Sequence, residues 1–342
     1  MRGKKPSGRG LHFLALVALS LLLIASATIA VTFGPADISP TEVWTTILHH
    51  LALVPESPVS RLRDAIVWDL RLPRVIAAMG VGAGLALAGA VMQALTRNPL
   101  ADPYLLGLSS GAALGAVTLV VMGFALLVPV GAFIGSLAAL GLALLIAQLL
   151  GGATPVRAIL AGISISALAS AMTSFIIFWS ATGDSYREIL SWLMGSLSGS
   201  GWVDAGLAMS LLLCAPIMLV SARGLDAFAF GDKSAASLGV DVARLRWTLL
   251  GASALLTGVM VAIGGAIGFV GLVVPHAVRL AVGSRHGKLL PLSMLVGAIF
   301  MLWADTMART LFDPRELPVG IVTALVGAPA FLLILMRFRR VT

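Results

Sequence analysis

Asp305 and Arg309 are the residues of this chain whose type and spacing most suggest chemistry inside an apolar segment. Asp305 is the one acid well inside such a run, and acids in apolar segments are candidates for proton or ion transfer. Arg309 lies four residues later, so on a helix the two side chains share one face and are able to pair. We favour a structural ion pair, and a proton relay through Asp305 is the alternative.

Two other patterns look like binding motifs but lack essential parts. The segment GSRHGK at 283–288 has three residues between its glycines, where a phosphate-binding loop has four, and Leu289 replaces the metal-binding Ser or Thr. His49 and His50 are able to ligate a metal, but without a cluster of cysteines or carboxylates nearby we expect a solvated loop. We therefore predict no catalytic site, no metal or cofactor bound by this chain, and no ATP hydrolysis by it.

The composition places these residues in a membrane protein. Of the 342 residues, 59% are hydrophobic and 11% are charged, with a mean hydropathy of +1.02, whereas a soluble domain carries about a quarter charged residues. A membrane helix needs roughly 20 apolar residues, and long continuous runs indicate helices because lipid cannot satisfy an open backbone. The predicted fold is all-α, a single transmembrane domain over 1–342 with about ten transmembrane helices. The predicted spans are 11–33, 74–96, 105–125, 127–150, 157–180, 203–222, 247–264, 266–282, 290–310 and 317–337.

The distribution of Lys and Arg predicts the orientation. Most of the 23 basic residues fall in the segments that lie on the same side as the N-terminus, so the positive-inside rule places both termini in the cytoplasm. The charges are spread over many loops, which argues against nucleic-acid binding. Outside, basic residues are few, yet residues 61–74 hold four arginines beside Asp64 and Asp69. Arg71 and Arg74 either pair with Asp69 or attract an acidic partner.

Small residues and capping signals mark where helices approach and end. Gly111 and Gly115, like Gly131 and Gly135, recur at the four-residue spacing that lets two helix backbones approach closely. In the longest inner loop, 222–247, Asp232 is a plausible N-cap and Gly239 a plausible helix stop.

Three segments together resemble the FecCD family of permeases: residues 71–116, which begin RLPRVIAAMG; residues 265–291, GAIGFVGLVVPHAVRLAVGSRHGKLLP; and residues 317–337, LPVGIVTALVGAPAFLLILMR. This family supplies the membrane subunits of ABC importers for iron-siderophore complexes, haem and vitamin B12. The resemblance covers nearly the whole chain. It implies the type II importer fold of the vitamin B12 permeases, in a bacterial inner membrane.

The resemblance also implies partners and contact residues. It implies a homodimer, two separate ATPase subunits that carry ATP and Mg, a periplasmic binding protein, a metal-chelate substrate and surrounding lipid. The implied positions for docking of the binding protein are Arg71, Arg74 and Arg309. Those for coupling to the ATPase lie in 222–247, at Gly231, Ser237, Leu238 and Gly239.

A cytoplasmic gate and a pathway follow from the same resemblance. The implied gate positions are Asn98, Leu100, Thr154 and Pro155, and Pro155 departs from the hydroxyl residue of the B12 relative. The implied pathway lining on the fifth span is Ser164, Ser166, Ser170, Thr173 and Ser174. For any one of these hydroxyls, bonding back to its own helix is an equally good interpretation. After that span, residues 183–202 are expected to form a short external helix that re-enters the mouth of the pathway.

The leading function is thus an ATP-driven import permease with alternating access at the homodimer interface. The alternatives are a stand-alone proton-coupled transporter that uses Asp305, and a membrane scaffold, which would not need the polar breaks at 97–103. Ferric siderophore ranks first among substrates, before haem and vitamin B12.

Overall fold

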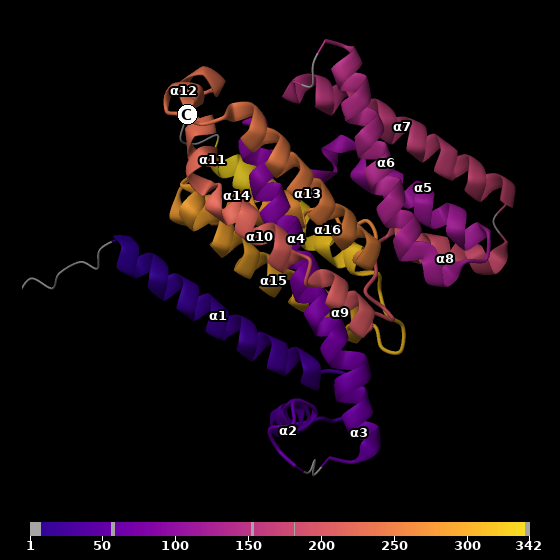
Figure 1. The fold of residues 1–342 in the computed structure, drawn as a ribbon. Helices are drawn as coiled ribbons and strands as arrows, with labels where there is room; N and C mark the ends of the chain where they lie inside the picture. The colour runs from indigo at the N-terminus through magenta and orange to yellow at the C-terminus, as the bar shows by residue number, and fades with distance from the viewer. Residues whose placement is uncertain (1–7, 56–58, 152–153, 181, 339–342) are drawn as a thin grey trace, which may run out of the picture.

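The protein is an all-helical, multi-pass membrane bundle (Figure 1). The computed structural model describes residues 8–55, 59–151, 154–180 and 182–338. Within these residues, 7 helices are long and apolar enough to cross a membrane, and three shorter apolar helices, Leu108–Val121, Val270–Val282 and Val319–Ile334, accompany them. Together they occupy the ten predicted spans.

The spanning helices follow one another along the chain, and the connections after α1, α7 and α10 contain short helices of their own. They are α1 (Gly8–Thr32), α4 (Leu72–Thr96), α5 (Leu108–Val121), α6 (Val128–Leu149), α7 (Pro155–Ser180), α9 (Trp202–Ala208) with α10 (Leu211–Val220), α13 (Val242–Gly264), α14 (Val270–Val282), α15 (His286–Thr310) and α16 (Val319–Phe338). The short helices are α2 (Pro40–His50), α3 (Arg61–Ala65), α8 (Gly183–Leu193), α11 (Ala222–Phe228) and α12 (Asp232–Ser237). In Figure 1, α2 and α3 lie at one end of the bundle and α12 at the other, and α5 to α8 form a group beside α13.

Helix α4 lies at the centre and packs against α15, α13, α14 and α9. Two glycines on it allow this close packing. A Cβ at Gly82 would lie 2.8 Å from the carbonyl carbon of Gly297 in α15, and a Cβ at Gly89 would lie 2.6 Å from that of Gly271 in α14. Only a residue without a side chain leaves room for the facing backbone at these positions.

The glycines at four-residue spacing in the third and fourth spans do lie where helix backbones approach closely. A Cβ at Gly111 of α5 would lie 3.0 Å from the carbonyl carbon of Gly135 in α6, and one at Gly115 would lie 2.7 Å from that of Gly131. The two helices therefore pack backbone against backbone over two turns.

Two segments depart from the hydropathy prediction. The second span begins well before residue 74, because α3 continues through a π-helical turn (Ile66–Arg71) into α4 as one helix over Arg61–Thr96. The wide turn ends at Arg71, two residues before Pro73, which lacks an N–H and cannot make a regular helical bond. The predicted span 203–222 is divided into α9 and α10, which hydropathy alone does not reveal.

Candidate functional site

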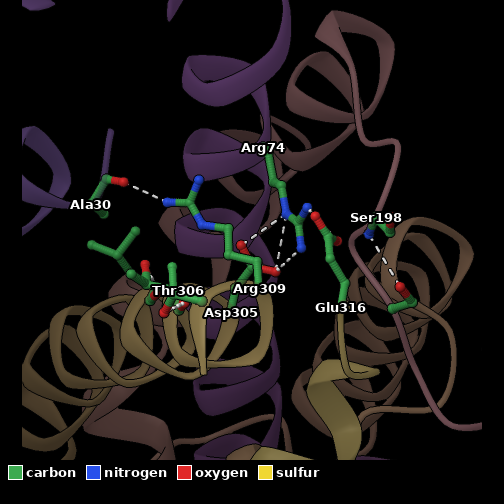
Figure 2. A network of polar contacts seen from close by, with 10 residues as sticks. Ala30, Arg74, Ser198, Asp305, Thr306, Arg309 and Glu316 are labelled. Carbon is green, nitrogen blue, oxygen red and sulfur yellow. Dashed lines mark hydrogen bonds and ion pairs between the residues drawn. The ribbon is translucent and has the colours of Figure 1, made fainter. Parts of the chain in front are cut away.

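A network of charged side chains joins α4, α15 and the segment before α16 at the predicted outer end (Figure 2). The Nε of Arg74 donates to both carboxylate oxygens of Asp305, at 3.2 and 3.0 Å, and its Nη2 donates to Oδ1 at 2.9 Å. The Nη1 of Arg74 donates to Oε2 of Glu316 at 2.9 Å. Asp305 is 1% exposed and Arg74 is 9% exposed, whereas the side chain of Glu316 is 41% exposed.

This geometry corrects the expected partner of Asp305. Arg309 shares a helix with Asp305, but its Nη2 donates to the carbonyl oxygen of Ala30 in α1, and Figure 2 shows its guanidinium turned away from Arg74. Asp305 faces the packed surface of α4 instead, so its ion pair is formed with Arg74 across the helix interface. The carboxylate is held by three donated hydrogen bonds from one guanidinium.

Arg71 is also buried and has a structural role. Its Nη1 donates to the carbonyl oxygens of Val31 and Thr32, at 2.9 and 3.0 Å, and its Nη2 donates to that of Ala36 at 3.1 Å. These carbonyls lie at the C-terminal end of α1 and just beyond it, where a helix leaves acceptors without intrahelical donors. Local pairing of Arg71 or Arg74 with Asp69 is therefore wrong: Asp69 is exposed, and both arginines have other partners.

The three arginines expected to dock a binding protein thus lie near one another at one end of the bundle, each engaged within the chain. Of their contacts, only the bond from Arg74 to Glu316 reaches an exposed side chain. Sequence reasoning missed Glu316, although a carboxylate directly before an apolar run and seven residues after Arg309 is a recognisable signal.

The inner loop forms two short helices, α11 and α12, separated by a turn at Ala229–Gly231. The expected stop at Gly239 is confirmed: its φ is +85°, and the N–H of Val240 donates to the carbonyl of Ala235 at 3.1 Å. This is the usual bonding of a glycine-terminated helix.

The expected N-cap of this loop is wrong. Gly231 precedes the helix with φ +93°, and Asp232 is the first helical residue. The carboxylate of Asp232 instead accepts from Arg246 of α13 at 2.8 Å and lies 3.8 Å from Arg97. These ion pairs fasten α12 to the body of the bundle.

Apolar side chains protrude from this loop. Phe230 is 75% exposed and Leu238 is 69% exposed, while the Ser237 hydroxyl donates back to the Ser234 carbonyl. Both apolar side chains lie beside the charged residues of the same end of the bundle.

The two expected gate turns both lie at exposed positions. Asn98 accepts the N–H of Leu100 at 2.9 Å, and both residues are exposed. Thr154 caps α7 by accepting the N–H of Arg157 at 3.4 Å. The side chain of Pro155 lies outside the described residues.

The hydroxyl residues of α7 divide between two faces. Ser164, Ser170 and Ser174 are exposed and Ser166 is half-buried, whereas Thr173 is 5% exposed and donates to the carbonyl of Ala169 at 2.8 Å. Thr173 therefore faces the interior of the subunit and does not line a surface. Ser164 also donates back to its helix, to the carbonyl of Leu160.

Known proteins share this architecture and sequence. The model of the FecCD transport family matches residues 21–337. The hemin transport system permease of Yersinia pestis is 41% identical, over 97% of this chain and 98% of its own length, and the cobalamin import system permease of Halobacterium salinarum is 40% identical, over 94% and 86%. A solved metal-chelate type ABC transporter in an inward-facing conformation superposes with a TM-score of 0.83 at 36% identity, over 94% of this chain and 98% of that one.

Proposed function

Because this chain belongs to the FecCD transport family, we propose that it is the membrane subunit of an ATP-driven importer that moves a metal chelate through a homodimer into the cytoplasm. The observation that carries the proposal is the loop at the inner end, where α11 and α12 present Phe230 and Leu238 to a soluble partner. That partner is an ATPase on a separate chain, where ATP and Mg bind. A binding protein delivers the substrate at the opposite end.

The names of the relatives limit the class of substrate. Their names specify hemin, cobalamin and, for a Haemophilus influenzae permease 36% identical to this chain, molybdate. We propose a metal chelate, with ferric siderophore first, then haem and vitamin B12. The binding protein, which makes the first contact with the substrate, sets most of the selectivity.

Reconstitution tests this function. In proteoliposomes that contain the permease, its ATPase and its binding protein, uptake of a ferric siderophore or haemin is expected to require ATP and to survive a protonophore. Uptake without the ATPase, driven by a proton gradient alone, would instead support the secondary transporter. The close pairing of Asp305 with Arg74 disfavours that alternative, because a proton carrier must release its charge partner during each cycle.

The exposed face of α7 supports a homodimer. Leu168, Met172 and Phe175 are each at least 47% exposed, and Ser170 and Ser174 lie among them. We propose that this mixed face meets the second copy and lines the pathway, since a wide lumen with few strong anchors lets a bulky chelate pass.

We further propose that the binding protein docks at the end of the bundle that carries Arg71, Arg74 and Arg309. A carboxylate of the partner would take the place of Glu316 on the Nη1 of Arg74, because that contact alone lies at the surface. Charge reversal at Arg74 is a poor test, since it would place a third carboxylate against Asp305 and Glu316.

Glu316→Gln is the sharper change. The neutral amide holds Nη1 of Arg74 less tightly than the Glu316 carboxylate, which competes with the partner's carboxylate. We therefore expect the affinity for the binding protein to rise by up to about fivefold, the range of an exposed ion pair. Surface plasmon resonance on the permease in nanodiscs measures the affinity. Asp69→Asn is the matched control, because it removes an exposed acid near the same end that has no ion pair within the described residues. Equal effects of the two changes, or weaker capture by Glu316→Gln, would contradict this assignment.

Coupling is tested at Gly239. At φ +85° a β-branched residue is strained, whereas asparagine tolerates this conformation. We expect Gly239→Val to distort the end of α12 and to lower uptake per ATP hydrolysed at least severalfold, and Gly239→Asn to retain most of it. The ratio of transported substrate to released phosphate in proteoliposomes measures coupling. Normal coupling in Gly239→Val would count against a role of this loop.

A further inference from the structure

A cavity of about 690 Å³ opens at the predicted inner end, between the end of α4, α11, the end of α14 and the start of α15. Its volume lies in the range of small-molecule sites. Pro99 of the gate turn and Phe230 of the coupling loop border it. Its polar lining consists mainly of Gln93, Arg97, Asp226, Arg279, Arg285 and His286.

The cavity carries an excess of positive charge. Arg279 and Arg285 line it from α14 and from the turn before α15, and neither has an ion pair with any described residue. The third arginine, Arg97, lies 3.8 Å from Asp232, whose other oxygen is bound by Arg246 at 2.8 Å.

The one acid of the lining is already engaged. Oδ1 of Asp226 accepts from the backbone N–H of His286 at 2.8 Å and lies 2.7 Å from its Nδ1. A carboxylate accepts but does not donate, so the Nδ1 of His286 carries the proton. Asp226 therefore orients the histidine and offsets only part of the charge of the arginines.

Two buried side chains of the lining have polar atoms without a hydrogen-bond partner in the described structure. His286 is 6% exposed and its Nε2 is unpaired, and Gln93 is 2% exposed with its Oε1 unpaired. A buried polar atom without a partner is unfavourable, so a ligand that supplies one is favoured. With the proton on Nδ1, neutral His286 presents Nε2 as an acceptor, and Oε1 of Gln93 also accepts, so both unpaired atoms suit hydroxyl donors such as those of a glycerol headgroup, while the arginines hold the anionic part.

We propose that this cavity binds a phosphate group, and specifically the headgroup of an anionic phospholipid from the cytoplasmic leaflet. The planar fork of a guanidinium matches the geometry of a phosphate, and basic pockets between membrane helices on the cytoplasmic side bind anionic headgroups. Apart from Ser284 and the buried His276, the rest of the lining is apolar and includes Leu225, Leu280 and Phe230. Leu280 is 50% exposed, and it lies between the exposed Ala277 and Ala281 on the last turns of α14. An apolar wall beside the mouth suits the glycerol and the first methylenes of a lipid better than the short acidic side chain of a protein partner.

The site has a structural consequence. It lies between the gate turn after α4 and the coupling loop, and Arg97 belongs to both its lining and the contact with α12. A bound headgroup would neutralise the arginines and hold these two segments together.

Native mass spectrometry of the full-length permease with its ATPase tests the proposal. Samples carry either phosphatidylglycerol or phosphatidylcholine, and the retained lipids are counted. We expect preferential retention of phosphatidylglycerol, reduced about fivefold for each arginine removed in Arg279→Gln and Arg285→Gln, since each basic residue near the lipid surface contributes roughly that factor. Arg244→Gln is the matched control, because Arg244 is an exposed arginine of the same end that does not line the cavity.

The outcomes separate the possible ligands. Melting temperatures in phosphatidylcholine nanodiscs show whether the variants are folded, so a loss of lipid is not mistaken for unfolding. Equal retention of the two lipids, or retention that the variants leave unchanged, overturns the proposal. If millimolar inorganic phosphate raises the melting temperature of the lipid-free complex as much as phosphatidylglycerol does, the ligand is free phosphate and not lipid. Release of the ATPase by the variants without any loss of lipid would assign the cavity to an acidic group of that partner.

Discussion

Replacement of Asp305 by alanine is expected to destabilise the protein by about 3–5 kcal/mol, the range for removal of one partner from a buried ion pair. Arg74 is 9% exposed and would keep only its single bond to Glu316. Its Nε and Nη2 would remain buried without acceptors, between α4 and α15, which pack extensively against each other. Reversible unfolding in mixed micelles, or the melting temperature in a mild detergent, measures the loss.

Two further variants show whether the effect comes from the uncompensated charge. Glu316→Gln should cost far less, because Glu316 is well exposed and exposed pairs contribute only about 0–1 kcal/mol. The double change of Arg74→Met with Asp305→Leu should recover most of the stability, since apolar residues often replace a buried pair without loss. If Asp305→Ala is as stable as the parent, the pair is not structural, and the proton relay regains support.

Gly89→Ala is expected to destabilise the protein by about 1–3 kcal/mol, the usual cost of an overpacked interior, although alanine is intrinsically the better helix former. The added Cβ would lie 2.6 Å from the carbonyl carbon and 2.7 Å from the Cα of Gly271. Those atoms are backbone, so α14 as a whole has to move away from α4. The hydrogen bond from Gln93 to the carbonyl of Leu272, at 3.2 Å, lies one turn further along the same interface and is expected to weaken with it.

Gly141→Ala provides the matched control. It is the same chemical change in the middle of α6, and a Cβ there meets no atom within 4 Å. Helix propensity then acts alone, so we expect a gain of up to about 1 kcal/mol, the opposite sign. Melting temperatures of the two variants in the same detergent measure both stability changes. A similar shift in both would contradict the packing argument.

The spans were predictable because hydropathy is a local property. Most apolar runs form helices long enough to cross the bilayer whatever their neighbours are, although three of the described helices are shorter. The glycine stop at Gly239 likewise depends on residues close in the chain. The helix boundaries differ from the hydropathy prediction at two places, near Pro73 and between α9 and α10. The helix that begins at Arg61 continues through a wide turn before Pro73, and the break between α9 and α10 falls at Met209 and Ser210, within a run whose hydropathy is high throughout.

The sequence by itself determined the class of this protein: a helical membrane permease of the FecCD family, with charged residues gathered at its two ends. Only the tertiary structure decided which of those charges meet. Asp305 lies four residues from Arg309, yet its partner is Arg74, 231 residues away. Spacing along a helix states which side chains share a face, but the neighbouring helix decides which acceptor each of them reaches. In hydrocarbon, where an unpaired charge is costly, that choice also decides which contacts remain at the surface for a partner.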